Sequence, residues 1–162
     1  MNYELGTQSP SQEFAIYRSQ ARSVWQDKIN LTNPQKEILY RRLLWNLQAQ
    51  NVVYPYQYFF DNCTTRVRDY LDEALSGRIA GVNDGFADST FRDQVQAHYE
   101  SVAVIGFSLD VLMNSNIDRL MSEWEEMFLP LKLRESLYLV ESDVAENGVR
   151  IKLLSDRQEV ML

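Results

Sequence analysis

The sequence contains very few of the residues that build disulfides, metal sites and membrane spans. One cysteine and one histidine occur among 162 residues, so the chain has no internal disulfide and no cluster suited to structural zinc. No apolar run approaches the roughly 18 to 20 residues needed to cross a bilayer. The N-terminus also lacks the basic and then apolar pattern of a secretion signal. We therefore expect no metal, no other cofactor and no membrane-spanning segment in this chain.

Basic residues are scarce relative to acidic ones. The chain has 16 Lys and Arg against 23 Asp and Glu, which gives a formal charge of −7 and no basic field to attract nucleic acid. Hydrophobic residues make up 45% of the chain and aromatic residues 12%, as in an ordinary globular protein. A chain of this length can form one domain with a substantial core. We therefore expect a single domain that does not bind nucleic acid.

The one cysteine lies at the start of a predicted helix. Asp61 and Asn62 are both favoured N-cap residues, and Gly77 stands where a left-handed C-cap is expected. A thiol in the first helical turn faces the positive end of the helix dipole, which favours the nucleophilic thiolate, and free amides there could hold an oxyanion. The alternative interpretation of Cys63 is a small buried structural residue. The buried face of this helix is predicted to carry Val67, Tyr70, Leu71, Ala74 and Leu75.

The remaining sequence predicts further helices and one hairpin. Asn33 and Pro34 begin a helix to Gln48, and its broad apolar face, with Ile38 and Trp45 on the other side, predicts a core helix covered on more than one surface or meeting a partner. Asn147 and Gly148 form a favoured hairpin turn. Other expected segments are an irregular lead over 1–12, a short helix over 13–20, extended segments over 24–32 and 51–60, a surface loop over 78–89, a helix from 90 to about 101 capped by Ser89 or Thr90, a helix or buried strand over 102–112, a helical pattern over 117–128 and a short helix over 131–138.

A cysteine nucleophile also needs a base and a group that stabilises the oxyanion. His98 is the single histidine, so it must supply the base if the catalytic machinery is complete within this chain; the competing interpretation places it on a solvated helix surface. Tyr58, five residues before Cys63, is the first candidate for contact with substrate or oxyanion. The competing interpretation is that the tyrosines at 54, 56 and 58 form an aromatic surface packed against the helices.

The stretch DNCTTRVRD at residues 61–69 resembles the N-terminal periplasmic domain family of the bacterial lipoprotein N-acyltransferase Lnb. Members of that family carry an aromatic run that leads into Asp/Asn-Asn-Cys, then Ser or Thr and an Arg-rich helix. The stretches RSVWQDKINLTNPQKEILYRRLLW and SEWEEMFLPLKL are similar as well, so the resemblance covers residues 22–133. It implies that Cys63 is the nucleophile. Its neighbours in the motif are Asp61, Asn62, Thr65 and Arg66.

The resemblance implies a fold related to permuted papain-like, NlpC-type thiol enzymes, in which the histidine precedes the cysteine. No histidine precedes Cys63 here, so we expect an α+β, predominantly helical domain that is incomplete on its N-terminal side. Within a single domain of residues 1–162, we expect an irregular lead and short helix over 1–21, a family-like core over 22–133 and a C-terminal β-hairpin extension over 134–162.

Together these observations predict a cysteine-dependent acyltransferase or amidohydrolase. The Cys63 thiolate attacks an ester or amide carbonyl, and the acyl-thioester passes to an amine or to water. The resemblance implies a lipoprotein or acyl-lipid substrate and an extracytoplasmic, periplasmic location within a larger exported or membrane-anchored protein. Without the upstream histidine, we expect the chain to be inactive alone and to self-associate through exposed apolar helix faces. The alternative function is a non-catalytic helical interaction domain with a structural Cys63.

Overall fold

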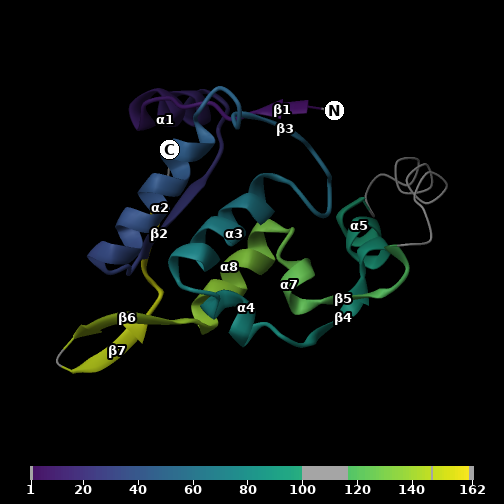
Figure 1. Ribbon diagram of the computed structural model, residues 1–162. Coiled ribbons are helices and arrows are strands. Elements are labelled where there is room, and N and C mark those ends of the chain that lie inside the picture. Colours follow the sequence, from purple (N-terminus) through teal and green to yellow (C-terminus); the bar gives the residue numbers. More distant parts are fainter. Residues whose placement is uncertain (1, 100–116, 147, 161–162) are drawn as a thin grey trace.

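The computed structural model describes residues 2–99, 117–146 and 148–160, which form a mixed α/β domain (Figure 1). In chain order the elements are β1 (Asn2–Glu4), α1 (Pro10–Ser19), β2 (Val24–Ile29), α2 (Asn33–Asn46), β3 (Val53–Pro55), α3 (Cys63–Ala74), α4 (Arg78–Val82), β4 (Phe86–Thr90), α5 (Phe91–Tyr99), β5 (Leu120–Ser122), α7 (Glu123–Glu126), α8 (Pro130–Leu139), β6 (Glu141–Glu146), β7 (Val149–Lys152) and β8 (Leu154–Val160). Residues 102–112, for which the sequence fits a helix or a strand, lie outside this description.

The strands in these ranges form four antiparallel pairs, β1 with β3, β2 with β8, β4 with β5 and β6 with β7. The pair β6 and β7 confirms the predicted C-terminal hairpin, because Glu146 lies opposite Val149 across a two-residue connection. Gly148 has φ +78, the left-handed conformation that this turn requires. The pair β2 and β8 joins segments from opposite ends of the chain, and β2 (Val24–Ile29) accounts for most of the extended segment predicted over 24–32.

The main core lies under α3, α4 and α8. The predicted apolar face of α3 is confirmed at four of its five positions, since Tyr70, Leu71, Ala74 and Leu75 are buried while Val67 is 51% exposed. Burial of each large apolar side chain in such a core stabilises the fold by about 1.5–3 kcal/mol. The buried members of this core are Leu31, Leu71, Leu75, Ile79, Met127, Leu133, Leu137, Val140, Leu153 and Leu154.

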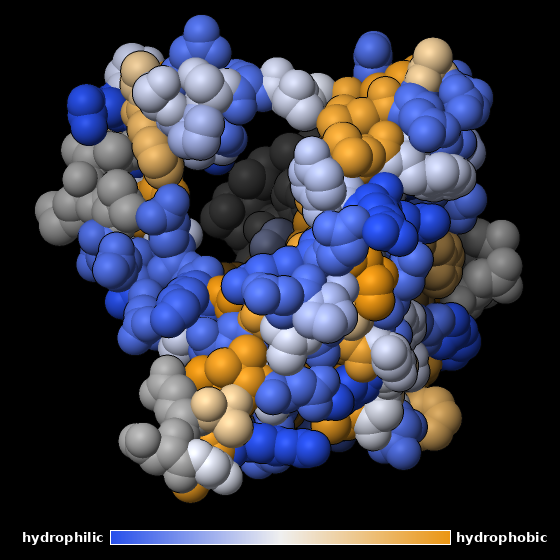
Figure 2. All heavy atoms as spheres, turned by 60° about the vertical axis from the view of Figure 1, so that its left-hand side comes forward, coloured by the Kyte–Doolittle hydropathy of each residue, from blue (hydrophilic) through white to orange (hydrophobic). Residues whose placement is uncertain are grey.

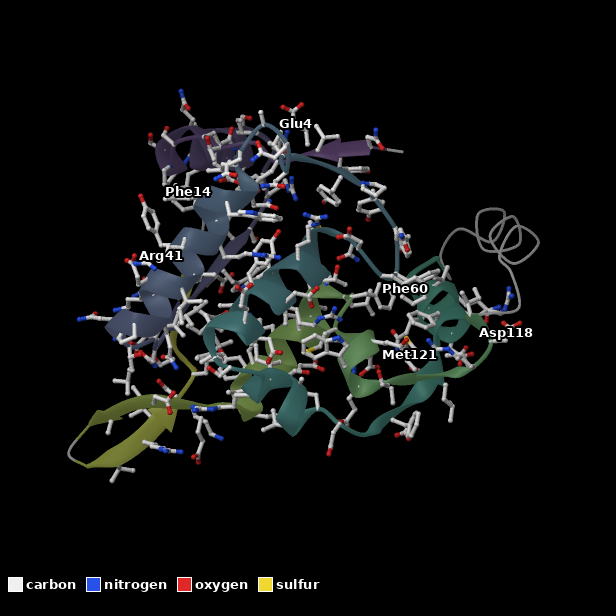
Figure 3. All side chains as sticks on the ribbon, viewed as in Figure 1. Glu4, Phe14, Arg41, Phe60, Asp118 and Met121 are labelled. Atoms are coloured by element: carbon white, nitrogen blue, oxygen red, sulfur yellow. The ribbon has the colours of Figure 1, made fainter. Side chains whose placement is uncertain are left out.

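A second, smaller core lies between the turn before α3 and the elements α5, β5 and α7. Its buried residues are Ala87, Phe91, Ile117, Met121 and Phe128, with Phe59 packed against them. Figure 3 shows Phe60 and Met121 on this side of the molecule. The ring centroids of Phe60 and Phe91 are 5.4 Å apart. These contacts attach the start of α5 to the segment that leads into Cys63.

The prediction that α2 is a core helix is wrong. Its N-cap is Thr32, which forms a capping box with Gln35, and the side chains that it buries are Gln35 and Asn46. The helix packs on α3, and Leu39 is partly buried against the main core, but most of the other apolar residues of α2 remain at the surface. Hydrophobic side chains lie among hydrophilic ones on the face shown in Figure 2. On α2 and its C-cap, more than a third of each side chain is exposed for Ile38, Tyr40, Leu43, Leu44, Trp45 and Leu47.

Several other predicted segments differ in the structure because tertiary contacts override weak local patterns. The lead over 1–12 is not irregular throughout, since Asn2–Glu4 pairs with β3 and α1 already begins at Pro10. The loop over 78–89 contains α4 and most of β4, and the helical pattern over 117–128 is a strand followed by a single helical turn. The short helices near 13–20 and 131–138 are confirmed as α1 and α8.

Candidate active site

The N-terminus of α3 is held by the side chain of Asn62. Its Oδ1 accepts hydrogen bonds from the amides of Thr64 and Thr65, both at 2.8 Å, and Thr65 Oγ1 accepts one from the Asn62 amide at 2.8 Å. Asn62 Nδ2 donates to the carbonyl oxygens of Tyr58 (2.9 Å) and Phe128 (3.0 Å). Of the two predicted caps, Asn62 is therefore the one used. It ties the preceding turn and the α7–α8 junction to α3.

Cys63 is the first residue of α3 and its side chain is exposed. An exposed thiol does not fit the interpretation of Cys63 as a small buried structural residue. Thr64 Oγ1 lies 4.0 Å from the sulfur. Because Asn62 occupies the amides of Thr64 and Thr65, and the Arg66 amide donates to Asn62 O, the Cys63 amide is the one N–H of this turn without a partner in the described part of the chain.

Cys63 borders a pocket of about 330 Å³ between β1, α2, β3 and α3. From α3, the positions i, i+3, i+4 and i+7 face it, so one stripe of the helix forms its wall. Apolar and aromatic side chains dominate the remaining lining. The residues around the pocket are Tyr3, Glu4, Leu5, Gly6, Leu43, Asn46, Tyr54, Cys63, Arg66, Val67 and Tyr70.

Arg66 brings a positive charge to this pocket, and Asp61 neutralises it. Arg66 Nε lies 2.7 Å from Asp61 Oδ1 and Nη2 lies 2.9 Å from Oδ2, so the pair is bidentate. These hydrogen bonds raise the pKa of Arg66. Its guanidinium stacks 3.5 Å above the Tyr54 ring, and Nη1 lies 3.4 Å from both Asn46 Oδ1 and Tyr70 Oη. The motif residues Asp61 and Arg66 therefore organise the pocket wall beside Cys63.

Two tyrosines other than the predicted one lie close to Cys63. Burial raises the pKa of Tyr54 and of Tyr56, and the negative charge of a Cys63 thiolate raises both further. Tyr58 lies on the turn at 57–61 instead, where its ring packs 4.9 Å from that of Phe59. The chain turns after Pro55, so the alternate-residue pattern could not show which tyrosine lies beside the thiol. The role predicted for Tyr58 stays a prediction.

His98 lies near the end of α5. Its predicted role as base depends on its side chain, which lies outside the part of the structure that is described. The start of that helix is as predicted, because Thr90 Oγ1 accepts a hydrogen bond from the Asp93 amide at 3.1 Å and the Asp93 carboxylate accepts one from the Thr90 amide at 2.8 Å.

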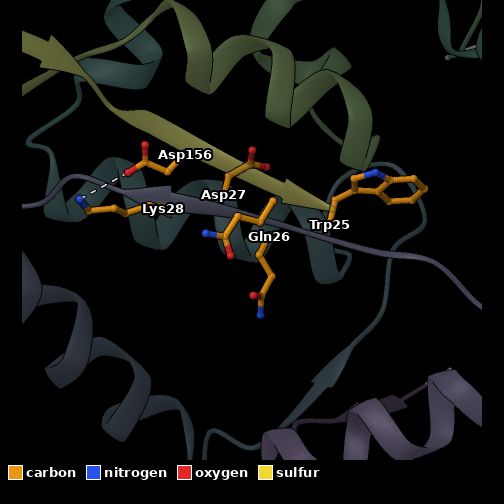
Figure 4. Close-up of a pocket in the computed structure, with 6 residues that line it drawn as sticks. Trp25, Gln26, Asp27, Lys28 and Asp156 are labelled. Carbon is orange, nitrogen blue, oxygen red and sulfur yellow. Dashed lines mark ion pairs between the residues drawn. The ribbon is translucent and has the colours of Figure 1, made fainter. Parts of the chain in front are cut away.

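A second, larger hollow of about 690 Å³ lies along the β2–β8 pair (Figure 4). It is lined by polar and charged side chains with Trp25 at one end, and Lys28 Nζ lies 3.6 Å from Asp156 Oδ2 across it. Among the described residues that line it, none carries a thiol or a hydroxyl group. In neither pocket, nor elsewhere among the residues searched, does a group of three or more His, Cys, Asp or Glu side chains form a metal site.

The helices of the described ranges are all too short or too polar to cross a membrane. A family model described as the Lnb N-terminal periplasmic domain matches residues 2–110, more than half of the chain. This match confirms the family that the resemblance suggested and the extracytoplasmic, periplasmic location. No curated protein and no solved structure matches this chain.

Proposed function

Because the chain belongs to the Lnb N-terminal periplasmic domain family, we propose that it carries the nucleophile of a cysteine-dependent acyltransferase or amidohydrolase. The observation that carries the proposal is the exposed Cys63 thiol at the capped N-terminus of α3, beside an apolar pocket. A thiol in that position experiences the positive end of the helix dipole, which stabilises the thiolate. The substrate class is an acyl lipid or lipoprotein, whose acyl group fits an apolar lining.

The proposed reaction proceeds through an acyl-thioester. The Cys63 thiolate forms a bond to the carbonyl carbon of an ester or amide, and the carbonyl electron pair moves to oxygen. The resulting oxyanion accepts a hydrogen bond from the Cys63 amide, with a tyrosine hydroxyl as the second donor. Collapse of this intermediate expels the alcohol or amine, which takes a proton. An incoming amine or water then attacks the thioester and releases the thiol.

The proposed reaction also needs a base that accepts the proton of the Cys63 thiol. His98 is the candidate within this chain, and Tyr58, Tyr54 and Tyr56 are the candidates for the second oxyanion donor. We also propose the permuted papain-like, NlpC-type fold for the whole domain. Its support is that Cys63 is the first residue of a helix that contributes to the main core.

The first experiment measures the reactivity of the thiol. The chain has one cysteine, so alkylation by iodoacetamide reports on Cys63 alone. We expect the folded protein at pH 7 to react more than tenfold faster than free cysteine, because only the thiolate is nucleophilic, and the urea-unfolded protein to react at the rate of free cysteine. If the folded protein reacts no faster than free cysteine, Cys63 is not an activated nucleophile.

The second experiment looks for the acyl-enzyme. After incubation with p-nitrophenyl octanoate, we expect an octanoyl adduct by mass spectrometry that hydroxylamine removes and that is absent in Cys63→Ala. The same assay on Tyr58→Phe, Tyr56→Phe and His98→Gln assigns the other roles, since each removes one donor or base. A Tyr58→Phe variant with unchanged acylation rate excludes Tyr58 from the mechanism.

A non-catalytic interaction domain is the second candidate function. The observation that favours it is the exposed apolar surface of α2, which could contact a partner or a second copy of the chain. The two functions predict different behaviour of Cys63→Ala. A structural cysteine implies lost stability, whereas a catalytic one implies a folded protein that forms no adduct.

A further inference from the structure

Asn46 contributes an almost completely buried amide to the pocket beside Cys63. The side chain lies in the last turn of α2, is 1% exposed and forms part of the pocket wall. A polar group at this depth in an apolar wall is unfavourable unless each of its atoms has a hydrogen-bond partner. The partners of Asn46 therefore indicate what the pocket is built to bind.

The two ends of the Asn46 amide differ in their contacts. Its Oδ1 accepts a hydrogen bond from Tyr70 Oη at 2.9 Å and lies 3.4 Å from Arg66 Nη1. Both neighbours are donors here, which assigns the oxygen to this side and the NH₂ group to the other. Nδ2 has no hydrogen-bond partner among the residues that the structure describes. Nδ2 is not among the fully buried atoms that lack a partner, and Asn46 lines the pocket, so we take the small exposed part of this amide to be a donor open to the pocket.

We propose that Asn46 Nδ2 donates a hydrogen bond to a carbonyl oxygen of the ligand that occupies this pocket. This inference rests on the proposed function and specifies the acyl donor further. Asn46 contacts Arg66 and Tyr70, which lie about one and two turns after Cys63 on the same face of α3, so the acceptor lies roughly 5–10 Å from the thiol along the helix. That oxygen is therefore distinct from the carbonyl under attack.

The chemistry of the wall selects the kind of acceptor. Asp61 already neutralises Arg66 through two hydrogen bonds, and the Tyr54 ring covers the guanidinium face. The pocket consequently offers a neutral amide donor among apolar side chains such as Leu43 and Val67. A ligand with two carbonyl oxygens and short apolar chains, such as a diester, satisfies both the thiol and Asn46. A diether of the same shape lacks the carbonyl oxygens and offers Nδ2 only ether oxygens, which are weaker acceptors.

The test uses binding in the absence of chemistry. Cys63→Ala protein labelled with ¹⁵N in its asparagine side chains is titrated with two ligands. One is the diester 1,2-dibutyrylglycerol, and the other is the matched glycerol diether, 1,2-di-O-butylglycerol, which lacks both carbonyls. We expect the diester to shift the Asn46 NH₂ resonances and to bind about tenfold more tightly than the ether, the ratio for one added hydrogen bond. Equal affinities for the diester and the diether, or NH₂ resonances that do not shift at saturation, overturn the proposal. The partner of Nδ2 would then be water rather than the ligand.

The variant Asn46→Asp separates the proposed ligand contact of the NH₂ group from the structural hydrogen bond that the side-chain oxygen accepts. The substitution keeps the oxygen that accepts from Tyr70 and removes the NH₂ donor, so we expect the diester preference to disappear while ether affinity is unchanged. Asn33→Asp makes the same chemical change at an exposed site on the same helix and serves as the control, with the preference retained. If Asn46→Asp does not fold, the resonance shift in the Cys63→Ala protein still shows whether the diester contacts the Asn46 amide. Absence of acylation in wild-type protein would count against the proposed function alone.

Discussion

At the scale of single residues, Asn62 determines which amides of the first turn of α3 are already hydrogen-bonded. Its side chain accepts from the amides of Thr64 and Thr65, so among the residues that the structure describes the amide of Cys63 is the donor of this turn without a partner. In the proposed reaction a second oxyanion donor would then come from a side chain, and the tyrosines of β3 and its continuation are close enough for their pKa values to respond to a Cys63 thiolate. Under that proposal the cap limits the oxyanion donors to one backbone group and one side chain.

Glu125 provides a prediction on pH dependence. Hydrogen bonds from Arg119 lower its pKa from 4.5 to about 2, so the ionised form stabilises the fold. This contribution is fully present above pH 4.5 and is lost as the pH falls toward 2. We expect Glu125→Gln to lower the free energy of unfolding by about 1–2 kcal/mol at pH 6, a value reduced for the exposure of Arg119, and to match wild type at pH 2. Urea denaturation across this range measures it.

Glu37→Gln is the matched control for this experiment. Glu37 pairs with Arg41 one turn away on α2, where both side chains are more than half exposed, so its removal should change the unfolding free energy by less than about 0.5 kcal/mol. Parallel pH profiles for Glu125→Gln and wild type would show that the Arg119 pair contributes nothing.

At the scale of secondary-structure elements, α3 depends on its N-terminal cap more than an average helix does. Asn62 is 6% exposed and its side chain makes four hydrogen bonds, two of them to neighbouring segments. We expect Asn62→Ala to lower the free energy of unfolding by about 2 kcal/mol, the upper end for a cap, because it also leaves buried carbonyls without donors. Thermal and urea unfolding measure the loss.

The cap prediction has a second readout at the thiol. If Asn62 positions α3, the alkylation rate of Cys63 in Asn62→Ala should fall toward that of free cysteine even where the protein is folded. Thr32→Ala, at the cap of α2, is the control. Its contact to the Gln35 amide is long at 3.5 Å, so we expect a loss near 1 kcal/mol or less with Cys63 reactivity unchanged. Equal effects of the two variants on alkylation would contradict a specific role of Asn62.

The exposed face of α2 leads to a prediction on association. Leu43, Leu44, Tyr40 and Leu47 lie on one side of the helix and its C-cap, each more than a third exposed. We expect concentration-dependent self-association in sedimentation velocity, and Leu44→Glu should shift the protein to monomer because a charge in an apolar contact is costly. Leu131→Glu, at an exposed leucine of α8, should leave association unchanged. If the wild-type protein is monomeric at all concentrations tested, α2 is not a self-association surface.

At the scale of the whole molecule, one charge cluster joins the β2–β8 pair to the main core. Arg134 on α8 makes two hydrogen bonds to Asp27 on β2, at 2.7 and 2.9 Å, and Tyr138 Oη donates to the same carboxylate at 2.8 Å. The hydrogen bonds from Arg134 lower the pKa of Asp27. A two-stranded pair is marginally stable by itself, so this cluster supports the link between the two ends of the chain.

Asp27→Asn tests that link. The substitution removes the charge that Arg134 pairs with, so we expect the free energy of unfolding to fall by about 2 kcal/mol and amide hydrogen exchange in β2 and β8 to speed up ahead of the core. Lys28→Met is the control, because Lys28 and its partner Asp156 are mostly exposed. Unchanged exchange in both strands of Asp27→Asn would show that strand pairing alone holds the two ends together.

The sequence by itself determined the local features around Cys63. Asn62 and Cys63 could be placed at the start of a helix because capping and apolar spacing act within a few residues. The predicted end is displaced, since the C-cap is Leu75 and the left-handed residue after it is Ser76 (φ +56), with Gly77 (φ +82) next in the chain. The same holds for the C-terminal hairpin, whose turn chemistry is local. The family resemblance also followed from the residues around Cys63, and the family match confirms it.

Only the tertiary structure decided which residues meet. Pairing of β1 with β3 and of β2 with β8 depends on contacts between distant segments, which leave no periodic signal in either strand. The exposure of α2 could not be read from its apolar face, because helical spacing shows which residues share a face but not whether another element covers it. Asn46, Tyr54 and Tyr56 join Cys63 only because α2 and β3 pack beside α3. Long-range packing, rather than local propensity, therefore built the pocket around a cysteine whose position at a helix start the sequence had already determined.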